Sequence, residues 1–170
     1  MGDDEGFHEF VSSRSPALLR TAYLLLGDWE LAEDLVQTAL VKAYQHWGRV
    51  VGAGSPEAYV RKIMVNERRS WWRRHRDREV VGGVPERAGP DESAALAERD
   101  AVWRAVLELP PRTRAVLVLR FWEDLSEADT AETLGCSIGT VKSTTSRGLR
   151  RLQQVLDGNV LASDRREVQE

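Results

Sequence analysis

The stretch from Leu125 to Leu152, which reads LSEADTAETLGCSIGTVKSTTSRGLRRL, predicts two helices joined by a tight turn. Ser126 can cap the first helix, because Asp129 follows three residues later in the capping-box position. Gly135 can end that helix, since glycine adopts the left-handed conformation without a steric penalty. Ser137 can then cap a second helix at once, so the stretch is predicted to form a helix-turn-helix.

The second predicted helix has an apolar face and a polar face that lacks carboxylates. Its apolar residues recur at helical spacing and predict the buried stripe: Ile138, Val141, Leu149, Leu152, Val155 and Leu156. Its polar face carries Thr140, Ser143, Thr144, Arg147 and Arg151. Short hydroxyl side chains let a backbone approach base edges, while arginines reach phosphates or guanine. This face favours duplex DNA, although a solvated face in an ordinary small bundle has the same geometry.

Composition argues against a disulfide-linked, a metal-binding and a membrane-spanning protein. The chain has 170 residues, a hydrophobic content of 42% and a single cysteine, so it can build real cores but neither an internal disulfide nor a cysteine zinc site. The three histidines, His8, His46 and His75, are scattered, and no carboxylate cluster has metal spacing. We therefore expect no metal, no cofactor and no enzymatic activity. No apolar run approaches a membrane span and no signal sequence is present, which predicts a cytoplasmic protein without membrane insertion.

The net charge of −3 hides two opposite segments. Residues 1–34 hold eight acidic and two basic residues, a balance of −6, whereas residues 61–78 hold eight basic and two acidic residues, a balance of +6. Such asymmetry indicates contact with nucleic acid on one surface and with another protein elsewhere.

The first half of the chain reads as three helices. We predict one over 7–26 with a break near Pro16, and one over 29–47 with apolar residues every four positions. The outer face of the second presents Asp34, Gln37, Thr38 and Val41, a strip that in most proteins is simply solvated. The glycine-rich residues 48–55 are predicted to be a flexible loop. A third helix starts at Pro56 and combines arginines with Trp71 and Trp72, which suits single-stranded DNA, unless the tryptophans are core anchors.

Glycine and proline mark the boundary between two domains. Residues 77–93 contain no helical period, and the helical pattern resumes at Ala94 and continues through an apolar helix after Pro111. We predict an all-α fold of two small helical bundles, residues 1–78 and 94–157, joined by a flexible linker over 79–93. A polar tail, residues 158–170, follows the second bundle.

Two separate sets of motifs resemble one protein family. LPPRTRAVLVLRF at 109–121, LSEA at 125–128 and GTVKS at 139–143 resemble region 4 of bacterial sigma factors. AEDLVQ at 32–37 and IMVN at 63–66 resemble region 2 of the same family. Since the two regions follow each other without an intervening domain, the chain is similar to the extracytoplasmic-function (ECF) group of the sigma-70 superfamily, and most to its actinobacterial SigE-like members.

The resemblance implies a sigma factor that binds core RNA polymerase, through the clamp helices and the flap, and directs promoter-specific initiation. An anti-sigma factor is implied as a further partner. The polymerase-binding residues would be Asp34, Gln37, Thr38 and Val41. The upstream promoter element would be read by Ser137, Thr140, Lys142, Ser143, Thr144, Arg147 and Arg151. The melted downstream element would be held by Asn66, Arg61, Lys62, Arg68, Arg69, Trp72 and Arg73, with the 48–55 loop and Asn66 capturing a flipped base.

The sequence departs from the family pattern at two places. Thr130 stands where many relatives have isoleucine, which weakens packing against Leu125, and Thr144-Thr145 replace a basic and an apolar residue. A stand-alone helix-turn-helix regulator or a response-regulator output domain would also explain residues 125–152. Either alternative leaves the basic, tryptophan-containing helix without a role.

Overall fold

The computed structural model describes the backbone of residues 3–52, 54–74 and 94–167, and the side chains of residues 4–52, 54–68 and 101–158. The described residues are helical and contain no strand, and the chain divides into two compact units, Met1–Val81 and Gly82–Glu170. The all-α fold with two helical bundles is therefore confirmed. The predicted linker over 79–93 lies outside the described residues.

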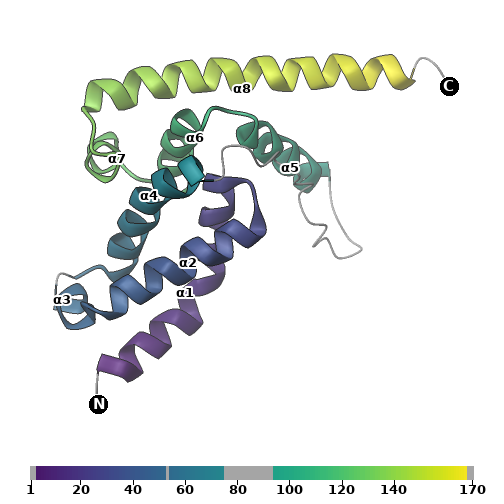
Figure 1. The fold of residues 1–170 in the computed structure, drawn as a ribbon. Helices are drawn as coiled ribbons and strands as arrows, with labels where there is room; N and C mark the ends of the chain where they lie inside the picture. The colour runs from purple at the N-terminus through teal and green to yellow at the C-terminus, as the bar shows by residue number, and fades with distance from the viewer. Residues whose placement is uncertain (1–2, 53, 75–93, 168–170) are drawn as a thin grey trace. The chain divides into compact units, whose positions relative to one another are not determined.

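Unit 1 is built on three packed helices, α1 (Asp3–Leu26), α2 (Trp29–Tyr44) and α4 (Pro56–Arg74), with the short α3 (Trp47–Gly52) between the last two (Figure 1). Gly27 has a φ of 79° and turns the chain at the end of α1. The carboxylate of Asp28 then accepts the backbone N–H of Leu31 at 3.0 Å, which caps α2. Small and medium apolar residues, including Ala32 and Met64, fill the interior.

The break that we predicted near Pro16 is wrong, because α1 runs through this residue. Proline removes one backbone donor and frees the carbonyl four residues earlier. Both Pro16 and Ser12 are exposed, so water can solvate the freed carbonyl and the helix continues.

The flexible loop that we predicted over 48–55 is also wrong in its first part, since residues 47–52 form α3. Trp47 and Val50 are buried, and the Trp47 ring lies 5.0 Å from that of Phe7 and 5.3 Å from that of Phe10, measured between centroids. The aromatic contacts come from α1, far away in the sequence, and they hold α3 in place. The second helix ends at Tyr44 rather than at Trp47, which belongs to α3.

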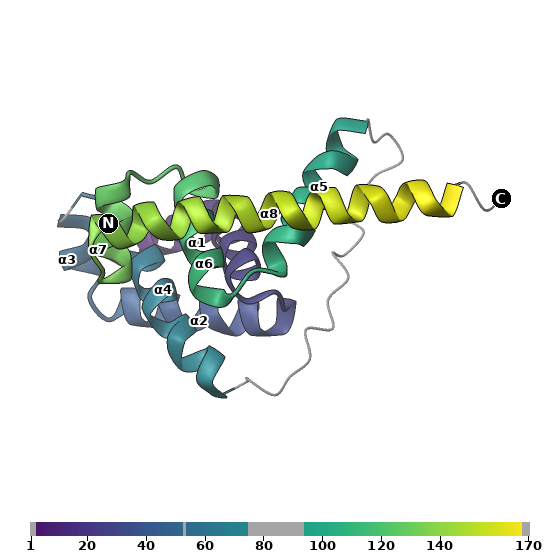
Figure 2. The same cartoon turned by 90° about the horizontal axis from the view of Figure 1, so that it is seen from above.

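Unit 2 contains α5 (Ala94–Leu107), α6 (Pro111–Leu117), α7 (Glu127–Leu134) and α8 (Ile138–Glu167). The π-helical turn η1 (Val118–Trp122) follows α6 directly. The long α8 packs on α5, α6 and α7, as both views of this unit show (Figures 1 and 2). Residues 158–167, predicted as a polar tail, continue α8. No described helix has the length and apolar character needed to cross a membrane.

The buried stripe of α8 differs from our prediction. Ile138 and Leu149 are 45% and 44% exposed, whereas Val141, Thr144 and Gly148 are buried. The cause is the close approach of α6. A Cβ built at Gly148 would lie 2.8 Å from Cγ2 of Thr113, so only small side chains fit along this contact.

Candidate nucleic-acid interface

The helix-turn-helix forms through the local contacts that the sequence predicts. The Ser126 hydroxyl accepts the backbone N–H of Asp129 at 3.0 Å and caps α7. Gly135 adopts the left-handed conformation with a φ of 63°, and the Ser137 hydroxyl accepts the backbone N–H of Thr140 at 3.1 Å. A small apolar cluster of Val116, Ala131 and Val141, with Leu134 and Cys136 against it, fixes the position of α8 on α6 and α7.

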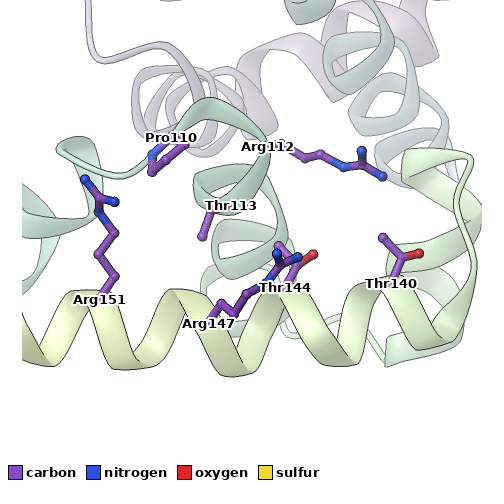
Figure 3. Close-up of a pocket in the computed structure, with 7 residues that line it drawn as sticks. All are labelled: Pro110, Arg112, Thr113, Thr140, Thr144, Arg147 and Arg151. Atoms are coloured by element: carbon purple, nitrogen blue, oxygen red, sulfur yellow. The ribbon is translucent and has the colours of Figure 1, made fainter.

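A pocket of about 440 Å³ lies between the start of α6 and one flank of α8 (Figure 3). Its wall on α6 is formed by Pro110, Arg112 and Thr113. Its wall on α8 is formed by four predicted DNA-contacting residues, Thr140, Thr144, Arg147 and Arg151. These four recur at a spacing of three or four residues, which places them on one side of the helix.

The chemistry of this pocket suits an anion. Three of its seven lining residues are arginines, three are threonines and none is acidic. Guanidinium groups bind phosphate oxygens with two parallel hydrogen bonds, and hydroxyl groups add further donors. A phosphate group of a nucleic-acid backbone therefore matches the pocket in charge and in hydrogen bonding.

Sequence reasoning missed Arg112 and Thr113 as members of this site. They lie in the motif that resembles region 4, but spacing along the chain gives no sign that they face α8. Their position follows from the α6–α8 contact at Gly148. Ser146 and Arg150 are also exposed on α8 and were not predicted.

The predicted upstream-element residues differ in their surroundings. Thr144 is only 5% exposed and lies at the base of the pocket, so this conformation offers it little access to base edges. Arg147 is exposed, and its Nε donates to the Ser143 carbonyl at 3.3 Å. The Ser137 hydroxyl lies 2.9 Å from that of Thr140, as part of the helix cap. These contacts hold the polar groups at the start of α8 in defined positions.

Lys142 lies on the other flank of α8. A helix turns about 100° per residue, so Lys142 is about 160° from Thr140 around the axis. Its Nζ is 3.6 Å from the Glu127 carboxylate of α7. The exposed face of α8 thus has a cationic pocket on one side and an ion pair on the other.

In unit 1, the described residues that we assigned to the downstream element fall into two groups. Lys62 and Asn66 are exposed on α4. The Arg61 side chain is 14% exposed and lies 3.7 Å from Glu57, which also contacts Arg14 of α1 at 3.5 Å. Arg68 is buried, and its Nε donates to the Val65 carbonyl at 3.2 Å, so its guanidinium belongs to the interior of the unit.

The remaining downstream-element residues, Arg69, Trp72 and Arg73, have backbone positions in α4, but their side chains lie outside the described residues.

The predicted polymerase-binding residues share the outer face of α2. Asp34 and Gln37 are exposed, Thr38 is half-buried, and Val41 is 58% exposed. An apolar side chain exposed within a polar helix face is a feature of protein contact surfaces when it belongs to a larger patch. Beside this strip, Lys42 pairs with Glu67 of α4 at 2.6 Å, which ties the strip to the helix that carries Asn66.

Comparison with known protein families matches both units. Residues 10–78 match the model described as sigma-70 region 2, and residues 99–152 match the model described as sigma-70, region 4.

Several curated relatives are similar over most of the chain. The RNA polymerase sigma-E factor of Streptomyces avermitilis is 40% identical over 156 residues, which cover 91% of this chain and 87% of the relative. The sigma-E factor of Streptomyces coelicolor is 39% identical and covers 98% of both chains. The ECF sigma factor SigL of Mycobacterium tuberculosis is 36% identical, with 82% of each chain covered.

Solved structures share the fold. The sigma factor RpoE of Bartonella quintana, solved in complex with the anti-sigma factor NepR, superposes with a TM-score of 0.69 at 29% identity, covering 90% of this chain and 98% of that one. CnrH, solved in complex with the cytosolic domain of CnrY, has a TM-score of 0.62 at 22% identity, with 92% and 91% covered. The chain therefore belongs to the ECF group of the sigma-70 family, whose members act in promoter-directed transcription.

Proposed function

We propose that this chain binds core RNA polymerase and directs it to promoters, reading the upstream element as duplex and the downstream element as melted strand. One observation carries the proposal. A helix-turn-helix unit with a pocket lined by three arginines is joined in one chain to a second helical unit that has its own polar and apolar strip on α2. A simple duplex-binding regulator needs only the first of these.

For the upstream element, the support is the exposed face of α8 and the pocket beside it. In a helix-turn-helix the second helix enters the major groove while nearby segments contact the backbone. Arg147 and Ser143 are exposed near the start of α8 and would face base edges. Arg112, Thr140 and Arg151 would bind a phosphate in the pocket. Thr144 would act by shaping the base of the pocket rather than by direct contact.

For the downstream element, the support is the exposed polar face of α4 and the turn that precedes it. Lys62 and Asn66 are exposed polar residues of α4, and Arg69, Trp72 and Arg73 lie further along the same helix. The turn between α3 and α4, with the exposed Val51 and Tyr59 on either side, would receive a flipped base. Capturing such a base offsets part of the few kcal/mol that unstacking costs.

For polymerase, the proposed surface is the α2 strip of Asp34, Gln37, Thr38 and Val41. Its combination of a carboxylate, polar groups and an exposed valine suits a contact with the clamp helices, while unit 2 would contact the flap. We also propose an anti-sigma factor as a partner, because a relative of the same fold has been solved with one.

A binding assay with matched variants tests the polymerase contact. Fluorescently labelled full-length chain is titrated with core polymerase, and Asp34→Ala is compared with Glu33→Ala, an exposed acidic neighbour about 100° away around α2. We expect Asp34→Ala to weaken binding about fivefold or more, as removal of a central interface residue does, and Glu33→Ala to change little. Equal effects of the two variants would remove the strip from the interface.

A gel shift separates the proposal from a stand-alone regulator. Full-length chain is mixed with genomic duplex fragments in the presence and absence of core polymerase. A sigma factor should select fragments only together with core, whereas a stand-alone regulator should select the same fragments alone.

A further inference from the structure

The ion pair between Lys142 and Glu127 places a carboxylate at the edge of the surface that we propose binds duplex DNA. The two side chains are 64% and 38% exposed, and their charged groups are 3.6 Å apart. The first helix of a helix-turn-helix crosses the DNA backbone, so a carboxylate at the start of α7 would lie close to phosphates.

The two acidic residues in the first turn of α7 have different contacts. Asp129 takes part in the helix cap, where its carboxylate accepts the Ser126 hydroxyl at 2.6 Å. Glu127 contacts α8 instead, through Lys142. An acidic residue near a helix N-terminus stabilises the helix by itself. The pairing of Glu127 with Lys142 also affects how that lysine can bind DNA.

Lysine and arginine contribute differently to DNA recognition. An ammonium group is a point charge that binds any phosphate, whereas a guanidinium can also read guanine through two hydrogen bonds. Phosphate contacts raise the affinity for every duplex alike. A carboxylate that holds Lys142 therefore weakens the contact that carries no sequence information and leaves Arg147 unaffected.

We propose that Glu127 lowers the affinity of α8 for duplex DNA of any sequence, by competing with phosphate for Lys142. This inference rests on the proposed contact between α8 and duplex DNA. Its effect should equal the strength of an exposed ion pair, which corresponds to an affinity change of about two- to fivefold.

A double-mutant cycle tests the coupling. The affinity of the full-length chain for a short duplex of mixed sequence is measured for wild type, Glu127→Gln, Lys142→Met and the double variant. We expect Glu127→Gln to tighten binding about two- to fivefold in the wild-type background and to have no effect beside Lys142→Met. Glu132→Gln is the matched control, because it makes the same charge change on α7 about 140° away around the axis.

A second variant and a second measurement guard against effects on folding. Glu127→Asp keeps the charge in the first turn of α7 but shortens its reach, so it should give an intermediate affinity. Because a phosphate contact adds to every duplex alike, Glu127→Gln should tighten binding to a promoter fragment and to mixed-sequence duplex by the same factor.

Three results would overturn the inference. If Glu127→Gln leaves the affinity unchanged while Lys142→Met weakens it, the carboxylate does not restrain the lysine, and the proposed duplex contact stands. If Glu127→Gln tightens binding equally in both lysine backgrounds, it acts by direct repulsion of phosphate. If neither Lys142→Met nor Arg147→Ala weakens duplex binding, the proposed DNA contact of α8 fails as well.

Discussion

Two arginines of unit 1 and three arginines of unit 2 are held in opposite ways. In unit 1, Arg68 is buried with a backbone partner and Arg61 belongs to a chain of ion pairs that joins α4 to α1 through Glu57. In unit 2, Arg112, Arg147 and Arg151 line a pocket that has no acidic residue. Arg61 and Arg68 of unit 1 stabilise its helix packing, whereas the three pocket arginines of unit 2 remain available to a ligand.

This difference shows that a count of basic residues is a poor guide to a DNA-binding surface. The segment 61–78 is the most basic part of the sequence, but two of its arginines serve the interior of unit 1. The pocket in unit 2 draws on residues that are far apart in the sequence and no charge run marks it. The variants below test this contrast, from the largest expected effect to the smallest.

Removing the guanidinium of Arg147 should have the largest effect on DNA binding. Arg147→Ala should weaken binding of the holoenzyme to promoter duplex by about 1–3 kcal/mol, or roughly tenfold to a hundredfold, because a base- or phosphate-contacting arginine is lost. Filter binding or anisotropy measures the change. Arg104→Ala, at an exposed arginine of α5, is the control and should bind as wild type does. Equal affinities for both variants would contradict the proposed contact of Arg147 with promoter duplex.

Replacing Arg68 should affect stability instead of ligand contact. Arg68→Ala loses a buried hydrogen bond to the Val65 carbonyl and should lower the stability of unit 1 by about 1–2 kcal/mol. Hydrogen exchange of peptides from residues 54–68 reports this unit separately from peptides of α6. Asn66→Ala, at an exposed position on the same helix, should leave exchange unchanged and weaken promoter opening. The opposite pattern would assign Arg68 to the nucleic-acid surface.

Replacing Thr130 should stabilise unit 2 without altering its ligand surface. The Thr130 side chain is buried in α7, and its hydroxyl has no hydrogen-bond partner among the described residues. Because an unpaired buried hydroxyl is costly, Thr130→Val should raise the stability of unit 2 by about 1 kcal/mol. Hydrogen exchange of α7 peptides measures the gain, with the half-buried Thr133→Val as a comparison. A loss of stability would mean that the hydroxyl has a partner in solution.

Breaking the ion pairs of Glu57 should have the smallest effect. Glu57→Gln removes the ion pairs that link Arg14 and Arg61. The side chains of Arg14 and Glu57 are 54% and 33% exposed, so solvent screens these pairs. We expect unit 1 to lose less than about 1 kcal/mol. Urea-dependent exchange of α4 peptides provides the measurement. If the variant bound single-stranded downstream DNA more tightly, Arg61 would be a contact residue restrained by Glu57.

The local features of the fold could be predicted from the sequence, and the tertiary ones could not. The caps at Ser126 and Ser137 and the left-handed Gly135 depend on neighbouring residues alone, and all three are confirmed. The helix at Trp47 was missed because rings from α1 stabilise it. The glycines and valines of residues 48–55 favour a loop when only neighbouring residues are considered.

The same distinction holds for the candidate site. The polar face of α8 follows from periodicity, but the burial of Thr144 results from the tight α6–α8 contact at Gly148. That contact also brings Arg112 into the same pocket as Arg147, which spacing along the chain does not reveal. The exposed strip on α2 follows from periodicity as well, and its contact with polymerase stays a prediction.

Run-off transcription with purified core RNA polymerase tests the central proposal most directly. Genomic fragments are transcribed with core alone, with core and the wild-type chain, and with core and Arg147→Ala. The account predicts discrete start sites that require the wild-type chain and weaken with the variant. Transcripts that are the same with and without the chain would contradict it.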